Sequence, residues 1–234
     1  MIEPLTHLLN KYGFRSTEIN NIVFGDKYLL VELKNKQIGV CATLQNLASE
    51  HVDIDVRQPD LNNINHRQIL NAYFNAHLNQ AVNHYENGDI FNTIDFNTFN
   101  NIIMIGNFRP LVQKFDEKAI ALTVFDLLND DERLTDISLQ DEYVKQADAI
   151  ILTATSISNN TFLNITNQSP AGCDIFLLGP SSILHEDMFE YKNIKMIFGT
   201  RFSADKQEIM EIIKQGHGTR KFMPYSEKVF LRKR

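Results

Sequence analysis

The spacing of hydrophobic positions changes near the middle of the chain. In the first half, short runs rich in β-branched and aromatic residues at 22–24, 28–33 and 38–43 are separated by tight turns. Runs of this length and composition are typical of strands joined by hairpins. We therefore predict a three-stranded antiparallel meander.

Two helices accompany this meander in the prediction. The apolar residues of 2–12 recur at helical spacing, and Gly13 follows as a stop. A longer apolar stripe at the same spacing extends from His66 to Tyr85. This stripe predicts a helix that covers one face of the meander.

The second half consists of near-continuous apolar runs separated by helical patterns. The runs are 102–106, 119–125, 149–153, 175–179 and 194–199, and the helical patterns are 109–118, 139–147, 161–166 and 204–215. Runs without alternation suit strands buried on both faces. Alternating strands and helices predict a Rossmann-like, doubly wound parallel sheet with helices on both faces.

A polar, Asn-rich stretch from Glu86 to Asn101 lies between the two halves and predicts a domain boundary. We expect an α/β protein with two domains. Residues 1–90 would form a small α+β meander domain, and residues 98–234 would form the Rossmann-like α/β domain.

Composition excludes some functions. A net charge of -6 argues against a general nucleic-acid binder, and the clear basic cluster at 232–234 is interpreted as an exposed C-terminal tail. Cys41 and Cys173 each lie inside an apolar run, which favours buried, reduced thiols and a cytoplasmic protein. We found no signal-like or membrane-spanning run, so we expect neither secretion nor a membrane partner.

Polar residues and glycines directly follow each apolar run of the second half. In an open parallel sheet, ligands bind beyond the carboxyl ends of the strands, so these residues are the candidate ligand-binding site. They are Gly106, Asn107, Asp126, Thr153, Ser156, Asn159, Asn160, Thr161, Gly179, Pro180, Ser181, Ser182, Gly199 and Thr200. If the loops converge, they would form a polar cleft.

Individual loops suggest different chemistry. The loop at Gly106 lacks the three spaced glycines of a dinucleotide fingerprint, which disfavours NAD or FAD held in the usual way. Asp126 follows Gly106 by twenty residues, where related folds place an acid against ribose hydroxyls, although a solvated strand-end Asp is the simpler interpretation. Hydroxyls from 153–161 at a helix start suit an anionic group or a simple helix cap.

No paired Cys or His spacing typical of zinc sites is present in the sequence. His51, Asp53 and Asp55 alternate and would share one side of a strand, and a polar strand face is the simpler interpretation. His217 is flanked by two glycines, which makes it the histidine most open to a functional role.

Taken in order, several blocks resemble the putative heavy-metal chelation family. These blocks are 105–111, 124–126, 147–161, 178–182 and 198–200. The family's Thr-Gly-Thr-Thr-like block is Thr-Ala-Thr-Ser at 153–156 here, and Asn160 stands where a glycine is common. The resemblance implies an enolase-N-terminal-like domain joined to a Rossmann-like domain, with metal chelation or metal homeostasis as the suggested role.

The matching positions are carried over as candidate cleft residues: Gly106, Asn159, Thr161, Gly179, Pro180, Gly199 and Thr200. We expect a small anionic or metal-chelating ligand in an interdomain cleft, with a divalent metal as the candidate cofactor. An enzyme using a nucleotide-like or S-adenosylmethionine-like cofactor and a non-catalytic scaffold remain alternatives, so catalysis stays open. A homo-oligomer is compatible with the sequence.

Overall fold

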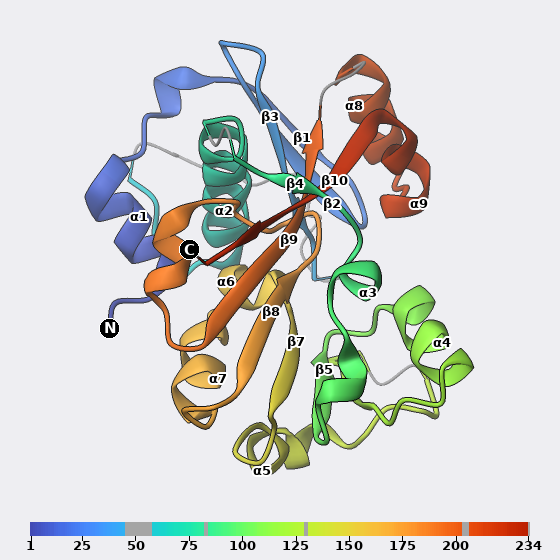
Figure 1. Cartoon of the computed structure of the whole chain (residues 1–234). Coiled ribbons are helices and arrows are strands. Elements are labelled where there is room, and N and C mark those ends of the chain that lie inside the picture. Colours follow the sequence, from blue (N-terminus) through green and yellow to red (C-terminus); the bar gives the residue numbers. More distant parts are fainter. Residues whose placement is uncertain (45–57, 82–83, 129–130, 203–205, 234) are drawn as a thin grey trace.

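Two β-sheets with their helices make up the computed structural model (Figure 1), which describes residues 1–44, 58–81, 84–128, 131–202 and 206–233. A three-stranded sheet has the order β1-β2-β3, and a seven-stranded sheet has the order β4-β10-β9-β8-β7-β5-β6. The predicted strand at His51, Asp53 and Asp55 lies outside the described residues. No helix in the described part of the chain is both long and apolar enough to cross a bilayer.

The small sheet is the predicted antiparallel meander. It comprises β1 (Ile19–Phe24), β2 (Tyr28–Leu33) and β3 (Ile38–Ala42), preceded by α1 (Pro4–Tyr12) and η1 (Ser16–Glu18). Glu3 caps α1 by accepting from Leu5 N and Thr6 N, and Gly13 ends it with φ 72°. A positive φ of this kind is readily adopted by glycine, as the sequence predicted for this position.

Helix α2 (Ile64–Leu78) covers one face of the meander. The helix approaches β3 closely at Gly39, because a Cβ there would lie 2.2 Å from Ala76 N and 2.3 Å from Ala72 O. Any larger residue at this position would therefore push the helix away from the sheet.

The prediction that this helix extends to Tyr85 is wrong. Asn79 follows the last helical residue, and its amide accepts from Leu184 N and donates to Ser182 O. Tyr85 instead packs its ring against the guanidinium of Arg201, 4.0 Å from the ring centroid. Packing against the large sheet thus ends the helix two turns before its apolar pattern does.

A stripe of polar side chains on α2 is buried, which is unusual for a helix next to a sheet. Arg67, Asn71, Asn75 and Asn79 follow one another at four-residue spacing, and each is 4% exposed or less. Four-residue spacing places them in one row along the helix. We call them the α2 polar row. The row faces the loops of the large sheet and bonds to their backbone, as described below.

The opposite face of the meander is covered by helices from the far end of the chain. These are α8 (Lys206–Lys214) and α9 (Thr219–Phe222), followed by η5 (Met223–Tyr225). Ile209, Ile213 and Phe222 form one apolar cluster with Leu30 and Val40 of the meander. The small sheet is therefore sandwiched between α2 and the C-terminal helices.

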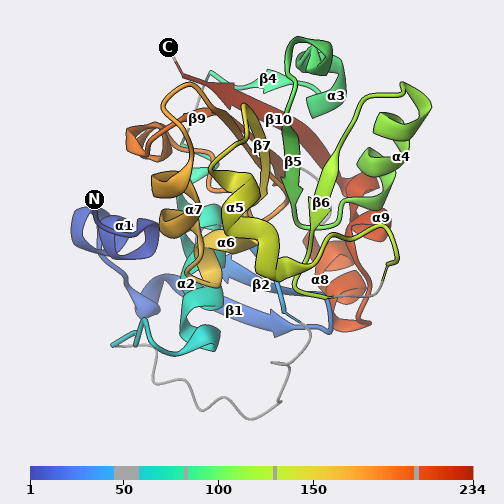
Figure 2. The same ribbon diagram turned by 90° about the horizontal axis from the view of Figure 1, so that it is seen from below.

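The large sheet has five parallel strands and an antiparallel edge. The parallel strands are β5 (Ile102–Ile105), β6 (Thr123–Phe125), β7 (Ala149–Thr153), β8 (Asp174–Leu178) and β9 (Ile194–Phe202). Helices lie on both faces (Figure 2), with α4 on one side and α5 and α7 on the other. The predicted doubly wound architecture is confirmed.

The remaining elements are short. They are α3 (Ile90–Thr93), η2 (Phe96–Thr98), α4 (Arg109–Glu117), η3 (Ile137–Leu139), α5 (Gln140–Val144), α6 (Thr155–Ser158), α7 (Phe162–Gln168) and η4 (Glu186–Glu190). The strand predicted from residue 119 begins only at Thr123, because Ala119 has φ 53° and ends the preceding helix.

Arg232 is exposed, as predicted, but the expectation that it belongs to a tail is wrong. This residue ends β10 (Ser226–Arg232), which pairs antiparallel with β9 and with β4 (Glu86–Asn87). The Arg232 guanidinium donates to both oxygens of Glu86, at 2.7 and 3.0 Å. The sheet is therefore mixed, and a residue pair from the predicted linker completes its edge.

One apolar core extends across both predicted domains. Leu8 of α1 and Leu70 of α2 belong to the same cluster as Ile150, Leu177 and Leu184 of the second half. The division at residue 90 remains a prediction, but the two parts share their largest core.

Removing one amide of the α2 polar row should destabilise the fold strongly. Asn75 donates to the carbonyls of Pro180 and Ser182 and accepts from Val40 N. Asn75→Ala leaves these groups unpaired, which should lower the free energy of unfolding by about 3 kcal/mol. Asn65→Ala in the first turn of the same helix should change it by less than about 0.5 kcal/mol. Urea denaturation measures both, and equal effects would contradict a special role for the row.

Both thiols are predicted to be inert in the folded protein. Cys41 and Cys173 are free and buried, as the sequence indicated, and burial raises the pKa of each to about 12. A thiol in the unfolded chain has a pKa of about 8.5. Burying the two neutral thiols therefore carries no ionisation cost below pH 8.5, but the free energy of unfolding falls as the pH rises from about 8.5 toward 12, because only the unfolded chain can then form the thiolates. Ellman's reagent at pH 8.5 should label the unfolded chain rapidly and the folded chain only at its unfolding rate.

Candidate functional site

The strand order of the large sheet reverses between β5 and β7, where such folds commonly bind ligands. Here the loop after β5 approaches the Thr153 side chain at the end of β7. Gly106 has φ 101°, and a Cβ on it would lie 2.7 Å from the Thr153 Cβ. The Thr153 hydroxyl lies 2.9 Å from that of Thr155. Both predicted residues at this point are therefore in contact with neighbouring protein atoms.

Asp126 joins two loops at the carboxyl end of β6. One carboxylate oxygen accepts from Asn107 N at 2.5 Å, and the other accepts from Leu128 N at 2.9 Å. Each oxygen of the carboxylate thus binds a backbone N–H. This arrangement gives Asp126 a role in holding the loop after β5.

The loop after β7 is held by its own side chains and by α2. Asn159 accepts from Thr161 N at 3.1 Å and from the Thr161 hydroxyl at 2.7 Å, while Ser156 is fully buried. Asn160 has φ 64°, a conformation that asparagine tolerates better than most residues, so it can replace the family's glycine. Arg67 donates to the carbonyls at 157 and 158.

One part of the loop after β8 is hydrogen-bonded inside the protein, and the other part lines a cavity. Ser181 accepts from Ala42 N at 2.9 Å, and Ser182 donates to the Phe198 carbonyl at 2.8 Å, so both hydroxyls are bonded inside the protein. The neighbouring Gly179 and Pro180 instead line a cavity. This cavity is the candidate binding site.

The cavity has a volume of about 590 Å³, which suits a small organic ligand. It is lined by the ends of β8 and β9, by the start of α4, by β10 and by parts of the meander and C-terminal helices. Of the predicted residues, Asn107, Gly179, Pro180, Gly199 and Thr200 line it. The others do not: Gly106, Asp126, Thr153, Ser156, Asn159, Asn160, Thr161, Ser181 and Ser182. The polar loops converge, but α2 occupies one side of them and the cavity lies on the other.

Sequence reasoning missed several lining residues, which are Tyr28, Asp89, Arg109, Lys114, Thr219, Met223 and Lys228. Arg109 and Lys114 belong to the helix after the first predicted strand of the second half, whereas the others come from the meander, the predicted linker and the C-terminal segment. Asp89 precedes the short apolar run of α3 and accepts from Phe91 N as its cap, a local signal that was available in the sequence. Lys228 belongs to β10, whose three-residue apolar run between charges gave little indication of a strand.

Charged side chains at the cavity are mostly cationic. Arg109, Lys114 and Lys228 line it together with the single carboxylate of Asp89. Lys114 lies 3.2 Å and Lys228 lies 3.3 Å from this carboxylate. Burial acts to raise the pKa of Asp89, but hydrogen bonds from Lys114 and Phe91 N and the charge of Lys228 hold it below its usual range. Asp89 is therefore ionised at neutral pH. Arg109 also lies 3.8 Å from Asp131, which is not part of the lining, so three cations face one carboxylate among the described lining residues.

Hydroxyls supply the neutral polar groups of the cavity. Thr200 lines it from β9, and no hydrogen bond within the described residues uses its side chain. Tyr28 and Thr219 share a hydrogen bond of 2.8 Å between their hydroxyls. Burial raises the pKa of Tyr28, so this residue is a neutral hydrogen-bonding group.

Metal-binding side chains are scarce at the cavity. Its described lining includes no His or Cys. His217, the histidine singled out from the sequence, is exposed at the end of α8 and does not line the cavity. One group of potential metal ligands within the described ranges, His7 with Asp187 and Glu190, lies elsewhere, between α1 and η4.

Comparison with known proteins supports the fold. The structure is similar to that of a DUF364-family protein of unknown function from Pyrococcus horikoshii, with TM-score 0.80, 21% identity and coverage of 92% of this chain and 93% of that one. It is also similar to a DUF364-family protein of unknown function from Desulfitobacterium hafniense, with TM-score 0.78, 16% identity and coverage of 98% and 96%. No curated protein matches the chain.

The family model described as "putative heavy-metal chelation" matches residues 89–232, which include every strand of the large sheet except β4. A match over this share of the sequence, together with the two similar structures, shows that the chain belongs to the DUF364 family.

Proposed function

We propose that the protein binds a small anionic ligand, either a metal chelator or its metal complex, in the cavity between the strand ends, α4 and the meander. The observation that carries this proposal is the excess of cationic groups at the cavity. A protein with net charge -6 places Arg109, Lys114 and Lys228 around one concave site. Clustered cations in a partly enclosed site favour anionic ligands.

Carboxylates or phosphates suit the arrangement of polar groups. Lys114 and Lys228 can move from Asp89 to a ligand oxygen, because their side chains are 42% and 57% exposed. The Thr200 hydroxyl offers a further hydrogen-bond donor. Phe108, Phe198 and Met223 supply apolar surface for the rest of the molecule.

A metal would enter this cavity with its chelator. Soft metals prefer thiolate and imidazole ligands, and the described lining offers neither. An anionic chelator can supply most of the ligands itself, while the protein recognises its negative charge. This mode of binding agrees with the description of the family.

The alternative enzyme with a nucleotide-like cofactor receives less support. Its key residue, Asp126, binds two backbone N–H groups and does not line the cavity. In this proposal the protein binds its ligand in the cavity, and no residue is assigned a catalytic role.

Replacing a cation at the cavity should weaken binding of an anionic chelator. With citrate and zinc citrate as probes, Lys228→Met should lower affinity about fivefold, and Lys228→Met with Lys114→Met about tenfold or more, because each ion pair contributes about 1 kcal/mol. Isothermal titration calorimetry of the full chain measures these affinities.

Lys195→Met is the matched control. Lys195 lies on the neighbouring strand β9, is similarly exposed at 59%, and pairs with Asp174 at 3.8 Å away from the cavity. The affinity of the Lys195→Met variant for both probes should equal that of the unmodified protein. Equal weakening by Lys195→Met and Lys228→Met would show a general charge effect and contradict the proposal.

A further inference from the structure

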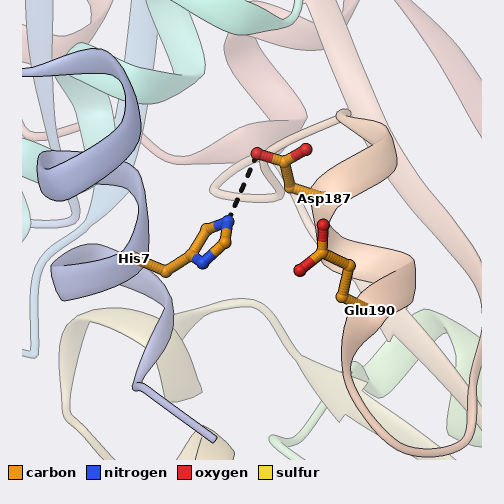
Figure 3. Close-up of side chains that lie close together, drawn as sticks. All are labelled: His7, Asp187 and Glu190. Atoms are coloured by element: carbon orange, nitrogen blue, oxygen red, sulfur yellow. Dashed lines mark ion pairs between the residues drawn. The ribbon is translucent and has the colours of Figure 1, made fainter.

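A group of potential metal-binding side chains lies outside the cavity lining, where α1 meets η4. His7 projects from α1, and Asp187 and Glu190 project from η4 (Figure 3). One ligand atom from each residue lies within 4.8 Å of the other two. The three side chains thus converge from two elements that are 180 residues apart in the sequence.

The spacing of His7 and Asp187 is unusual for a simple hydrogen bond. His7 Nε2 lies 3.4 Å from Asp187 Oδ2, and this buried nitrogen has no hydrogen-bond partner. Hydrogen bonds between nitrogen and oxygen are about 2.9 Å long. Two ligand atoms at about 2.0–2.1 Å from a tetrahedral Zn²⁺ ion lie about 3.4 Å apart. The observed separation therefore matches one edge of a metal tetrahedron.

Asp187 is held in place from its other sides. Its side chain is 7% exposed, and Lys11 Nζ lies 2.7 Å from Oδ1. The Tyr12 hydroxyl donates to Oδ2 at 2.9 Å, and His185 Nδ1 lies 3.4 Å from Oδ1. A carboxylate oxygen has two lone pairs, so Oδ2 can accept from Tyr12 and still bind a cation. Hydrogen bonds to a ligating carboxylate orient it, as in established metal sites.

Glu190 can supply the third ligand. Its carboxylate is exposed, and no hydrogen bond within the described residues uses it. Figure 3 shows this carboxylate on the same side of η4 as that of Asp187. A water molecule can complete the tetrahedron from the solvent side.

We propose that His7 Nε2, Asp187 Oδ2 and the Glu190 carboxylate bind a divalent first-row transition metal ion such as Zn²⁺. One imidazole and two carboxylates suit this class of ion better than a soft thiophilic metal. The site is independent of the cavity and of the function proposed for it. Because its ligands come from α1 and η4, the ion also links the N-terminal helix to the large-sheet half.

Zinc titration of the metal-free full chain tests this proposal. Substitution of residues that merely support a metal's ligands commonly costs 10–100-fold in affinity, so loss of a direct ligand in His7→Gln or Glu190→Gln should weaken Zn²⁺ binding at least about 100-fold. Competition with a chromophoric zinc chelator measures these affinities.

The chain offers a matched control in a histidine that pairs with the same short helix, η4. His84 Nε2 lies 3.1 Å from Glu186 on η4, and both side chains are exposed, at 37% and 62%. His84→Gln should leave Zn²⁺ affinity unchanged. Co²⁺ provides a second readout, since a tetrahedral Co²⁺ complex absorbs strongly in the visible range and should lose this absorption in Glu190→Gln.

Two results would overturn the proposal. One is unmodified protein that fails to bind Zn²⁺ or Co²⁺ at micromolar concentration, and the other is Glu190→Gln and His7→Gln variants that bind as tightly as His84→Gln. The circular dichroism spectrum of each variant shows whether it is folded. Lys228→Met should retain full Zn²⁺ affinity, and Glu190→Gln should retain full citrate affinity, so failure at one site is distinguishable from failure at the other.

Discussion

The arrangement of the molecule depends on the α2 polar row, which bonds a helix of one half to the loop backbone of the other. Asn71 donates to the Ser181 carbonyl, and Arg67 donates to the carbonyls at 157 and 158. Buried carbonyls of loops are costly when they lack a partner, so these side chains replace the water that would otherwise solvate the strand ends. The meander is thereby fixed on one side of the strand-end loops. The other side remains open as the cavity.

Much of the fold was predictable because its apolar pattern is local. The meander, the five parallel strands and most helices follow from periodicity within short windows. The errors occur where a distant contact overrides the pattern. The helix predicted to reach Tyr85 ends at Leu78 because Asn79 bonds to the loop at 182–184, and β10 exists because β9 and β4 pair with it.

The candidate site was predictable only in part, because the same types of polar residue in its loops can serve either ligand binding or internal hydrogen bonding. Small hydroxyls and amides after a strand can bind a ligand or satisfy the protein itself, and the sequence does not distinguish the two uses. Here Ser182 and Asn159 bond internally, whereas Gly179 and Thr200 line the cavity. The contact between Asp89 and Lys228 was not predictable, because these residues are 139 positions apart and are brought together by the edge of the mixed sheet.

The covering of the meander by α8 and α9 has a consequence for synthesis of the protein. Leu30 and Val40 emerge from the ribosome well before Ile209, Ile213 and Phe222, which shield them. Until then the nascent sheet has one bare apolar face, which favours engagement by chaperones over independent folding. The meander is therefore expected to acquire its native packing only after the segment that carries α8 and α9 has been translated.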